Sequence, residues 1–359
     1  MTNYLLTGGG TGGHVNPLLA LAELIRRSEP EAQVIALGTR EGLESRLVPE
    51  RGFELVTIAR LPFPRKPSLY ALKFPFAFNY AVNQIVELIR SRNIDVVVGF
   101  GGYASAPAYV AAAKAKVPYV IHEANALPGM ANRQGAKKAA AVAVAFASTR
   151  LPKAQLTGMP LRAEIEQAIL VSDKRVAREH FGLRSDVPTL LVTGGSLGAR
   201  SINQALVEAQ SALDAAGVQV LHIVGGNSEL EEIKTQSLVR IKYCDRMDLA
   251  ISAADLAVAR AGASTVCEFG AFGLPSVFVP YPVGNGEQRF NAADLVSAGG
   301  ATVVADAQFD ADYIRDSVIP LISNSRKLAQ MSQTAKKASI ANGTQRLYQL
   351  VLGVLPRKN

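Results

Sequence analysis

Two glycine-rich turns, about half a chain apart, constrain this sequence most. The first, GGGTGGH, spans residues 8–14 and directly follows the apolar run at residues 4–6. The second, GGSLGAR, spans residues 194–200 and directly follows the apolar run at residues 190–192. Each reads as a strand, a tight turn and a helix start, a geometry that lets backbone N–H groups approach an anion. Two such turns predict two nucleotide-fold halves.

Length and composition agree with a two-domain globular chain. A chain of 359 residues exceeds one compact core, and 48% of its residues are hydrophobic. The only cysteines, Cys244 and Cys267, form no CxxC pattern, which disfavours a disulfide scaffold or a zinc site. We expect no signal peptide, because no basic region precedes the first apolar run. We also expect no membrane-spanning segment, because no apolar stretch reaches about 18 residues.

The net charge of +8 is confined to the first half of the chain. Residues 1–161 carry 18 Lys and Arg against 10 Asp and Glu, whereas residues 162–359 carry 20 of each kind. A basic half is typical of a protein that faces nucleic acid, an anionic membrane or a phosphorylated substrate.

Short apolar runs alternate with helical patterns along the whole chain. This alternation predicts an α/β fold with parallel sheets covered on both faces. The expected strands lie at residues 4–7, 33–37, 54–58, 95–99, 118–122, 141–145, 189–193, 218–224, 256–259 and 276–280. A Gly- and Pro-containing hinge at residues 157–161 separates domains 1–161 and 162–341. We expect the C-terminal helix, within residues 342–359, to pack back on the first domain.

The first turn formally matches the dinucleotide fingerprint GxGxxG at Gly8, Gly10 and Gly13. That fingerprint also requires an acid at the tip of the second strand, where this chain has Gly38 and Thr39. A nicotinamide-dependent dehydrogenase is therefore disfavoured. Neither turn contains the lysine of a P-loop, which disfavours an NTPase.

His14 begins the helix after the first turn. It could be a simple helix cap, but it stands where open α/β sheets bind ligands, and a neutral imidazole can accept a proton near pH 7. We favour a functional role for His14.

Two further segments of the second half carry candidate ligands. Glu268 lies one turn inside a helix that starts near residue 262, where it could bind a ribose diol or merely favour the helix dipole. The spacing alone supports ribose binding and a helix-dipole role for Glu268 equally well. Gln288 and Asn291 lie in a polar loop that suits sugar hydroxyls but equally suits solvent.

Aromatic and basic residues alternate over residues 60–92. This segment has six basic residues, one acid and four prolines. Such a pattern is typical of a surface that lies on an anionic membrane, although stacking on nucleic acid or burial in a core would look similar. The prolines disfavour a fully buried segment. The candidate membrane patch comprises Arg65, Lys66, Leu72, Lys73, Phe74 and Phe76.

Taken in series, seven motifs resemble the MurG family, the bacterial N-acetylglucosaminyltransferases of family 28. The motifs cover nearly the whole chain: GGTGGH at residues 9–14, GGYAS-P at 101–107, HE-N at 122–125, G-P-R at 158–162, GGS-GAR at 194–200, R-GA-TV-E at 260–268 and EQ-N at 287–291.

The resemblance implies a GT-B fold, in which two Rossmann-like doubly wound parallel-sheet domains face a deep cleft. It implies that His14 is catalytic and that the second domain holds UDP-N-acetylglucosamine. The implied donor-binding residues are Thr11, Gly12, Gly13, Asn125, Arg162, Gly195, Ser196, Cys244 through its backbone, Ser264, Thr265, Glu268, Gln288 and Asn291. The implied acceptor-side residues are Gly10, Tyr103, Ser105, His122 and Glu123.

The implied reaction is the inverting transfer of N-acetylglucosamine to the lipid-linked N-acetylmuramyl-pentapeptide in peptidoglycan synthesis, and hence in cell-wall biogenesis, shape and division. The implied partners are this undecaprenyl-pyrophosphoryl acceptor, an anionic membrane surface and cell-wall synthesis or division proteins, with no nucleic acid. The implied location is peripheral, on the cytoplasmic face of the cell membrane. We expect no cofactor and no metal, because no carboxylate or histidine cluster accompanies either turn.

Two alternatives remain open at this point. One is a GT-B transferase that uses another UDP-sugar or acceptor, and the other is a non-catalytic nucleotide- or membrane-binding module. The chain also departs from the family pattern at Ala124 and Met159, where glutamine and asparagine are common, and at Leu197, where glutamine is usual. Gly286 and Glu287 replace a more basic and polar pair.

Overall fold

The computed structural model describes residues 1–64, 66–283 and 286–355. The chain forms two compact units. Unit 1 comprises Met1–Ala163 and the C-terminal segment from Asn342, and unit 2 comprises Glu164–Ala341. The boundary expected after residue 161 therefore falls at Ala163. Among the described helices, none has the length and apolar character needed to cross a membrane.

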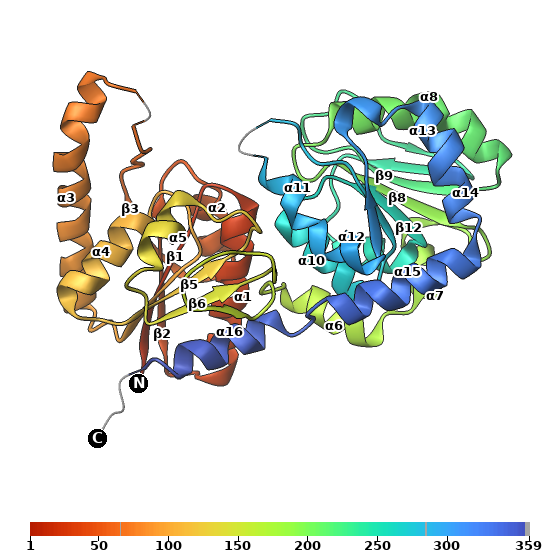
Figure 1. Ribbon diagram of the computed structural model, residues 1–359. Helices are drawn as coiled ribbons and strands as arrows, with labels where there is room; N and C mark the ends of the chain where they lie inside the picture. The colour runs from red at the N-terminus through yellow and green to blue at the C-terminus, as the bar shows by residue number, and fades with distance from the viewer. Residues whose placement is uncertain (65, 284–285, 356–359) are drawn as a thin grey trace. The chain divides into compact units, whose positions relative to one another are not determined.

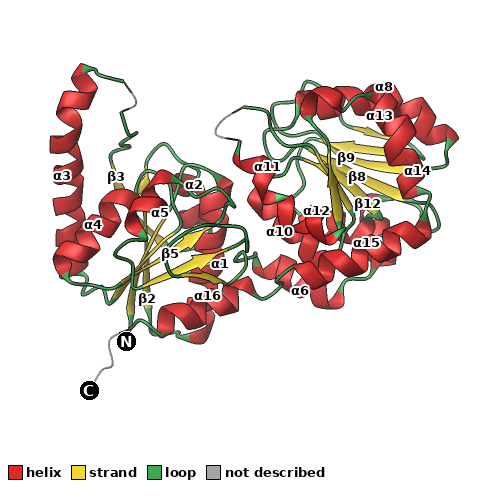
Figure 2. Ribbon diagram, viewed as in Figure 1, coloured by secondary structure: helices red, strands yellow, loops and turns green. Residues whose placement is uncertain are grey.

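Unit 1 is built on a seven-stranded sheet in the order β3-β2-β1-β4-β5-β6-β7, with parallel pairing throughout. Its strands are β1 (Asn3–Thr7), β2 (Gln33–Thr39), β3 (Glu54–Ile58), β4 (Val96–Gly99), β5 (Tyr119–Glu123), β6 (Ala141–Val144) and β7 (Ala154–Leu156). Its helices are α1 (Gly12–Ser28), α2 (Glu44–Glu50), α3 (Leu69–Ser91), α4 (Ser105–Ala115), α5 (Met130–Gly135) and α16 (Gly343–Leu352). Figure 2 shows these helices around the yellow strands.

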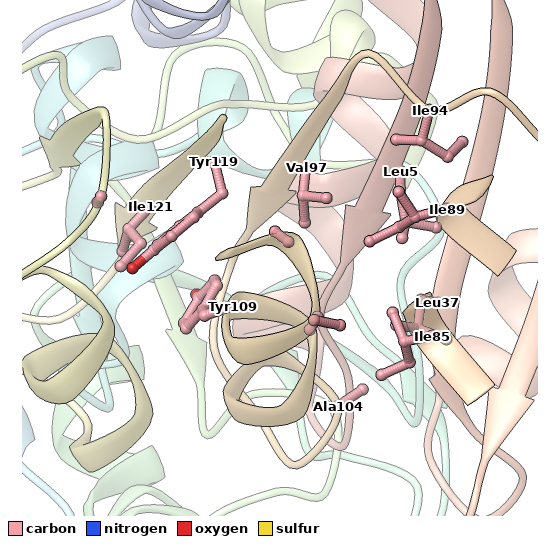
Figure 3. Packing of buried hydrophobic residues seen from close by; sticks show 14 of the residues in the cluster. Leu5, Leu37, Ile85, Ile89, Ile94, Val97, Ala104, Tyr109, Tyr119 and Ile121 are labelled. Carbon is pink, nitrogen blue, oxygen red and sulfur yellow. The ribbon is translucent and has the colours of Figure 1, made fainter. Parts of the chain in front are cut away.

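Both faces of this sheet are buried, which explains why its central strands are mostly apolar, as in β4 (VVVG). In β1, Leu5 packs into the cluster on one face, and Tyr4 and Leu6 pack into the cluster on the other. Figure 3 shows the first cluster, in which Leu5 and Val97 of the sheet lie near Ile89 of α3.

The C-terminal helix α16 belongs to unit 1, where it lies beside α1 (Figure 1). Its residues Leu347 and Val351 are fully buried in the second cluster. The hydroxyls of Tyr348 and Tyr4 both donate to Glu29 Oε1, at 2.7 and 2.6 Å. Burial and the Glu29 carboxylate raise the pKa of Tyr348 to about 12. Apolar burial and a shared acceptor thus fix the end of the chain on unit 1.

Unit 2 repeats the same design in the strand order β10-β11-β9-β8-β12-β13-β14, with one antiparallel pair, β10 and β11. Its strands are β8 (Thr189–Thr193), β9 (Gln219–Ile223), β10 (Ile233–Lys234), β11 (Leu238–Ile241), β12 (Leu256–Ala259), β13 (Ser276–Phe278) and β14 (Ala301–Val303). Its helical elements are α6 (Ala163–Val171), α7 (Lys174–Phe181), α8 (Arg200–Ala215), α9 (Met247–Ala253), α10 (Ala263–Phe272), α11 (Glu287–Asn291), α12 (Ala293–Ala298), η1 (Asp306–Gln308), α13 (Ala311–Tyr313), η2 (Ile314–Val318), α14 (Ile319–Ile322) and α15 (Ser325–Ala338).

The predicted α/β class and two parallel sheets are confirmed, and all ten expected strands overlap an observed one. Four observed strands, β7, β10, β11 and β14, were not expected. In each unit the strand order reverses next to the strand that precedes the glycine-rich turn, between β1 and β4 in unit 1 and between β8 and β12 in unit 2. Open α/β sheets bind ligands at such reversal points, outside the carboxyl ends of the strands.

Candidate functional site

Each unit has a candidate site at the reversal point of its own sheet. Turn 1 (residues 8–14) leaves β1 and opens α1, and turn 2 (residues 194–200) leaves β8 and opens α8. In both, the glycines permit backbone conformations that other residues rarely adopt, as φ reaches +88° at Gly10 and +84° at Gly195. No added Cβ would meet a described atom at either glycine.

His14 is held at the start of α1 by the backbone of turn 1. Its Nδ1 lies 3.0 Å from the carbonyl oxygen of Gly9, and Thr11 Oγ1 lies 3.4 Å from the same nitrogen. A carbonyl only accepts, so Nδ1 must carry the proton and Nε2 is the acceptor of the neutral ring. A methyl group on Gly101 would lie 3.1 Å from Nε2, so glycine at the end of β4 leaves room for the ring. The arrangement suits a general base.

A buried carboxylate that sequence reasoning missed supports turn 1 from behind. Glu44, at the start of α2, is 1% exposed, and its Oε2 accepts the N–H of Gly10 at 2.8 Å. Its Oε1 accepts the N–H and the hydroxyl of Thr39 at 2.8 and 2.9 Å. Glu44 therefore binds backbone groups at the end of β2 and in turn 1. Its carboxylate is taken up by protein donors and is not the ribose-binding acid of the dinucleotide fingerprint, so that interpretation stays disfavoured.

Three predicted acceptor-side residues are buried, and their side chains have partners within the protein. Ser105, His122 and Glu123 are 0–2% exposed. The Ser105 hydroxyl donates to the carbonyl of Gly101 at 2.7 Å, and His122 Nε2 lies 3.0 Å from the carbonyl of Gly158. Burial lowers the pKa of His122 to about 4, so this ring is neutral near pH 7. The side chains of Ser105 and His122 thus contact backbone carbonyls near the ends of β4 and β7.

Glu123 organises the loop that carries Asn125. Its carboxylate accepts the N–H groups of Asn125 at 2.9 Å and Gly129 at 3.0 Å, and the amide of Asn132 at 2.9 Å. Asn132 in turn accepts the hydroxyl of Tyr109 at 2.7 Å. Buried polar groups need such partners, so the HE-N motif is largely a loop-shaping device that leaves Asn125 half-buried at the edge.

Tyr103, like Gly10, is an exposed residue of the predicted acceptor side. It follows the Gly101–Gly102 turn at the end of β4, where a Cβ on Gly102 would overlap the backbone of Gly9. The Arg60 guanidinium lies 4.7 Å from the Tyr103 ring centroid and 3.3 Å from its hydroxyl. Tyr103 and a cation therefore flank turn 1.

Turn 2 is held by backbone rather than by a carboxylate. The carbonyl of Ser196 accepts the N–H of Gly226 at 2.9 Å, and a Cβ on Gly198 would overlap the carbonyl of Val224. Ser196 and Leu197 are exposed, and within the described residues their N–H groups have no protein acceptor. Leu197, a departure from the family pattern, is 70% exposed. Turn 2 thus presents backbone donors at the N-terminus of α8, a geometry that suits an anion.

Helix α10 brings the next predicted donor residues to the end of β12. Ser264 and Thr265 lie in its first turn, and Glu268 follows one turn later at 9% exposure. The Ser264 hydroxyl oxygen is buried and has no hydrogen-bond partner among the described residues. Cys244, whose backbone was expected near the base, lies 8% exposed after β11.

Asn291 and Gln288, which the resemblance assigns to the sugar, both have partners within the protein. Asn291 is fully buried and its amide donates to the carbonyl of Ala261 at 3.1 Å, so it anchors α11 instead of reaching outward. Gln288 is half-buried, and its Oε1 accepts the N–H of Tyr281 at 3.0 Å. Arg162 was expected in the second domain and instead lies at the end of unit 1. The departures Ala124 and Met159 are both buried.

Among the described residues, no group of three or more His, Cys, Asp or Glu side chains could hold a metal ion. One Asp-x-Asp sequence occurs, at Asp310 and Asp312. Asp310 caps α13 by accepting the N–H of Tyr313 at 2.8 Å, and Asp312 pairs with Arg315. Both carboxylates therefore have structural partners.

The candidate membrane patch lies on the first half of α3, which projects beyond the sheet of unit 1 (Figure 1). Leu72 and Phe76 are 72% and 81% exposed, and Lys66 and Lys73 are also exposed. Phe74 is half-buried, because its ring contacts those of Phe63, Tyr70 and Phe78. Arg65 lies outside the described residues.

Comparison with known proteins agrees with this arrangement. The glycosyltransferase family 28 N-terminal domain matches residues 4–144, and the family 28 C-terminal domain matches residues 189–347. The chain is 54% identical over 351 residues to the UDP-N-acetylglucosamine–N-acetylmuramyl-(pentapeptide) pyrophosphoryl-undecaprenol N-acetylglucosamine transferase of Leifsonia xyli, covering 98% of each chain. It is 55% identical to the protein of the same name from Clavibacter michiganensis, covering 98% of this chain and 96% of that protein.

Solved structures point the same way. The crystal structure of Acinetobacter baumannii MurG superposes with a TM-score of 0.81 at 26% identity, covering 99% of this chain and all of that chain. The kitacinnamycin glycosyltransferase, at 18% identity and a TM-score of 0.71, shares the fold. The chain belongs to glycosyltransferase family 28.

Proposed function

We propose that this protein transfers N-acetylglucosamine from UDP-N-acetylglucosamine to the 4-hydroxyl of N-acetylmuramic acid in the undecaprenyl-linked pentapeptide precursor of peptidoglycan. The observation that carries the proposal is the similarity, over nearly the full length, to transferases that bear this name. The geometry of the two turns supplies a base in one unit and an anion site in the other.

His14 is the proposed general base. As the 4-hydroxyl oxygen attacks the anomeric carbon of the donor, the hydroxyl proton moves to His14 Nε2, the acceptor nitrogen of the neutral ring. The bond between the anomeric carbon and the diphosphate oxygen breaks, and its electron pair leaves with UDP. Attack opposite the leaving group inverts the configuration at that carbon.

Turn 2 and α10 are the proposed donor site. The N–H groups of Ser196 and Leu197, together with the N-terminus of α8, would stabilise the negative charge that develops on the departing diphosphate. The carboxylate of Glu268 would accept the ribose hydroxyls, and the buried Ser264 hydroxyl gains a partner in the same site. We propose that no metal ion takes part in this step.

Peripheral binding to an anionic membrane, on its cytoplasmic face, is the proposed location. The exposed apolar side chains of α3 stand beside exposed lysines, and the lipid-linked acceptor requires an enzyme that works close to a bilayer. Lysines near an anionic leaflet contribute about 1 kcal/mol each, a contribution that salt screens.

A UDP-release assay with the lipid-linked muramyl-pentapeptide tests the activity. We expect turnover with UDP-N-acetylglucosamine and little with UDP-glucose or UDP-galactose. Equal rates with the other UDP-hexoses would indicate a transferase of different specificity. UDP binding without turnover on any donor would indicate a binding module.

Vesicle flotation tests the location. Binding to phosphatidylglycerol-containing vesicles should fall with salt without vanishing, and Leu72→Ser/Phe76→Ser should reduce the salt-insensitive part. The matched control is Leu170→Ser/Val171→Ser, which removes two equally exposed apolar side chains from α6. Equal binding by both double variants would show that the apolar side chains of α3 do not contact the membrane.

A further inference from the structure

We propose that Glu44 is a positioning residue for His14 and acts through the single peptide group that joins Gly9 to Gly10. This role deepens the proposed function, on which it rests, because it concerns the proton acceptor of that reaction. Glu44 does not reach the substrate, so its effect must pass through the backbone of turn 1.

The peptide group between Gly9 and Gly10 connects the two side chains directly. Its N–H donates to Glu44 Oε2 at 2.8 Å, and its carbonyl oxygen lies 3.0 Å from His14 Nδ1. The C=O and N–H of a trans peptide point to opposite sides of one rigid plane. Glu44 and His14 therefore lie at opposite edges of the same peptide plane. A tilt of this plane at the Glu44 edge moves the Gly9 carbonyl oxygen, which accepts the hydrogen bond from His14 Nδ1.

Three glycines around Glu44 leave the space that its buried side chain occupies. Built Cβ atoms at Gly9, Gly38 and Gly42 would each lie within 2.4 Å of a Glu44 side-chain atom. Three glycines from separate segments thus surround one carboxylate. Its other oxygen is fixed by two donors from Thr39, so the side chain has little freedom to turn away.

The carboxylate should strengthen the hydrogen bond that sets the ring of His14. An N–H that donates to a charged acceptor polarises its peptide, which makes the carbonyl oxygen a better acceptor. A stronger bond at Nδ1 holds the proton there and leaves Nε2 to accept the substrate proton. Carboxylates that bind a catalytic histidine directly fix its tautomer and orientation in the same sense.

Glu44→Gln tests this role, since it keeps the shape and removes the charge. Its single amide oxygen cannot satisfy the donors of both Gly10 and Thr39, and its NH₂ would oppose one of them. We expect kcat to fall about 10- to 100-fold, the range seen when orienting partners of a histidine are removed. The affinity for UDP and the KM for the donor should not change. Glu50→Gln, an exposed position on the same helix, is the matched control.

Histidine NMR supplies a readout that a merely structural role would not move. The chain has four histidines, so the ¹⁵N signals of His14 can be assigned by single replacements. Glu44→Gln should shift His14 from the Nδ1–H tautomer toward a mixture, while the buried His122 and His222 keep their signals and report that both units are folded. If Glu44→Gln does not fold, Glu44→Asp, which retracts the carboxylate, should show the same shift.

A double variant separates this proposal from the proposed function. In a His14→Ala background, Glu44→Gln should cause no further loss of turnover, because its effect passes through the imidazole. Additive losses, or wild-type kcat and an unchanged tautomer in Glu44→Gln, would overturn the role of Glu44 alone. Near-normal turnover of His14→Ala would overturn the proposed base as well.

Discussion

The two glycine-rich turns leave their sheets in the same way but are held by different groups. In turn 1, one N–H is taken by the buried carboxylate of Glu44, and a histidine follows at the helix start. In turn 2, the backbone of Val224–Gly226 supports the loop, and the N–H groups of Ser196 and Leu197 have no protein acceptor among the described residues.

This difference indicates a division of roles. In turn 1 the carboxylate already takes the N–H of Gly10, so that donor is not available to an anionic ligand. Backbone donors without acceptors in turn 2 favour an anion such as a diphosphate. We therefore propose that one local motif serves two kinds of chemistry, according to the groups that hold its backbone.

Replacing His14 should have the largest effect. We expect His14→Ala to reduce turnover by about 10²- to 10⁴-fold, the usual contribution of a general base. Affinity for UDP, measured by calorimetry, should change little because turn 2 and α10 lie in the other unit. Near-normal turnover of the variant would show that His14 is not the general base. Loss of UDP binding would show instead that His14 belongs to the donor site.

Replacing Glu268 should weaken the proposed donor site in unit 2. We expect Glu268→Ala to weaken UDP binding by about 1.5–3 kcal/mol, the scale of hydrogen bonds to a charged group. The preference for UDP over 2′-deoxy-UDP should shrink at the same time. The matched control is Glu208→Ala on the surface of α8. An unchanged preference would contradict ribose binding.

Acid should destabilise both units through one buried histidine in each. Burial lowers the pKa of His122 to about 4 and that of His222 to about 3, from the usual 6.5. Below pH 6.5 the unfolded chain binds protons that the folded chain excludes, so stability falls with pH until the folded pKa is reached. Each histidine should cost about 2 kcal/mol between pH 6.5 and pH 5.

Urea unfolding of wild type and His222→Gln at these two pH values measures the effect. His222 Nε2 lies 3.0 Å from Asn203 Oδ1, so glutamine retains a polar side chain there without the titration. The variant should be less stable overall but should lose less stability on acidification than wild type. An equal loss in both proteins would show that other groups dominate.

A chelator should have no effect at all. We expect unchanged turnover in excess EDTA, because backbone donors of turn 2 are proposed to stabilise the leaving diphosphate. Activity that disappears with EDTA and returns with magnesium would contradict this account.

The sequence predicted the parts of the fold that depend on doubly buried strands. Runs such as residues 190–192 of β8 are apolar because both faces of the sheet are covered, and this pattern is local in the sequence. The missed strands β7, β10 and β14 lie at sheet edges, where part of each strand is exposed and no apolar run is needed. In β11, Arg240 interrupts the apolar sequence LVRI, so no strand was expected there. The arginine is accommodated because its Nε lies 3.4 Å from His222 Nδ1 on the neighbouring strand β9.

The candidate site was predictable only where it is local in the sequence. The position of His14 follows from a strand, a glycine turn and a helix within a few residues. Glu44 contacts Gly10 from 34 residues away, and no spacing rule reveals that contact. Glu123 at the end of β5 and Asn291 at the end of α11 are polar, as ligand contacts would be, and the structure adds that their side chains bind backbone groups of Gly129 and Ala261.

One matched pair of variants tests the division of roles most directly. Gly10 in turn 1 and Gly195 in turn 2 have similar backbone conformations, with φ of +88° and +84°, and a Cβ would meet no described atom at either. Gly10→Ala and Gly195→Ala therefore impose the same backbone strain and nothing else. Calorimetry with UDP should show weaker binding for Gly195→Ala and unchanged binding for Gly10→Ala, whose turnover alone should fall. Equal loss of UDP affinity in both variants, or loss in Gly10→Ala only, would contradict the account.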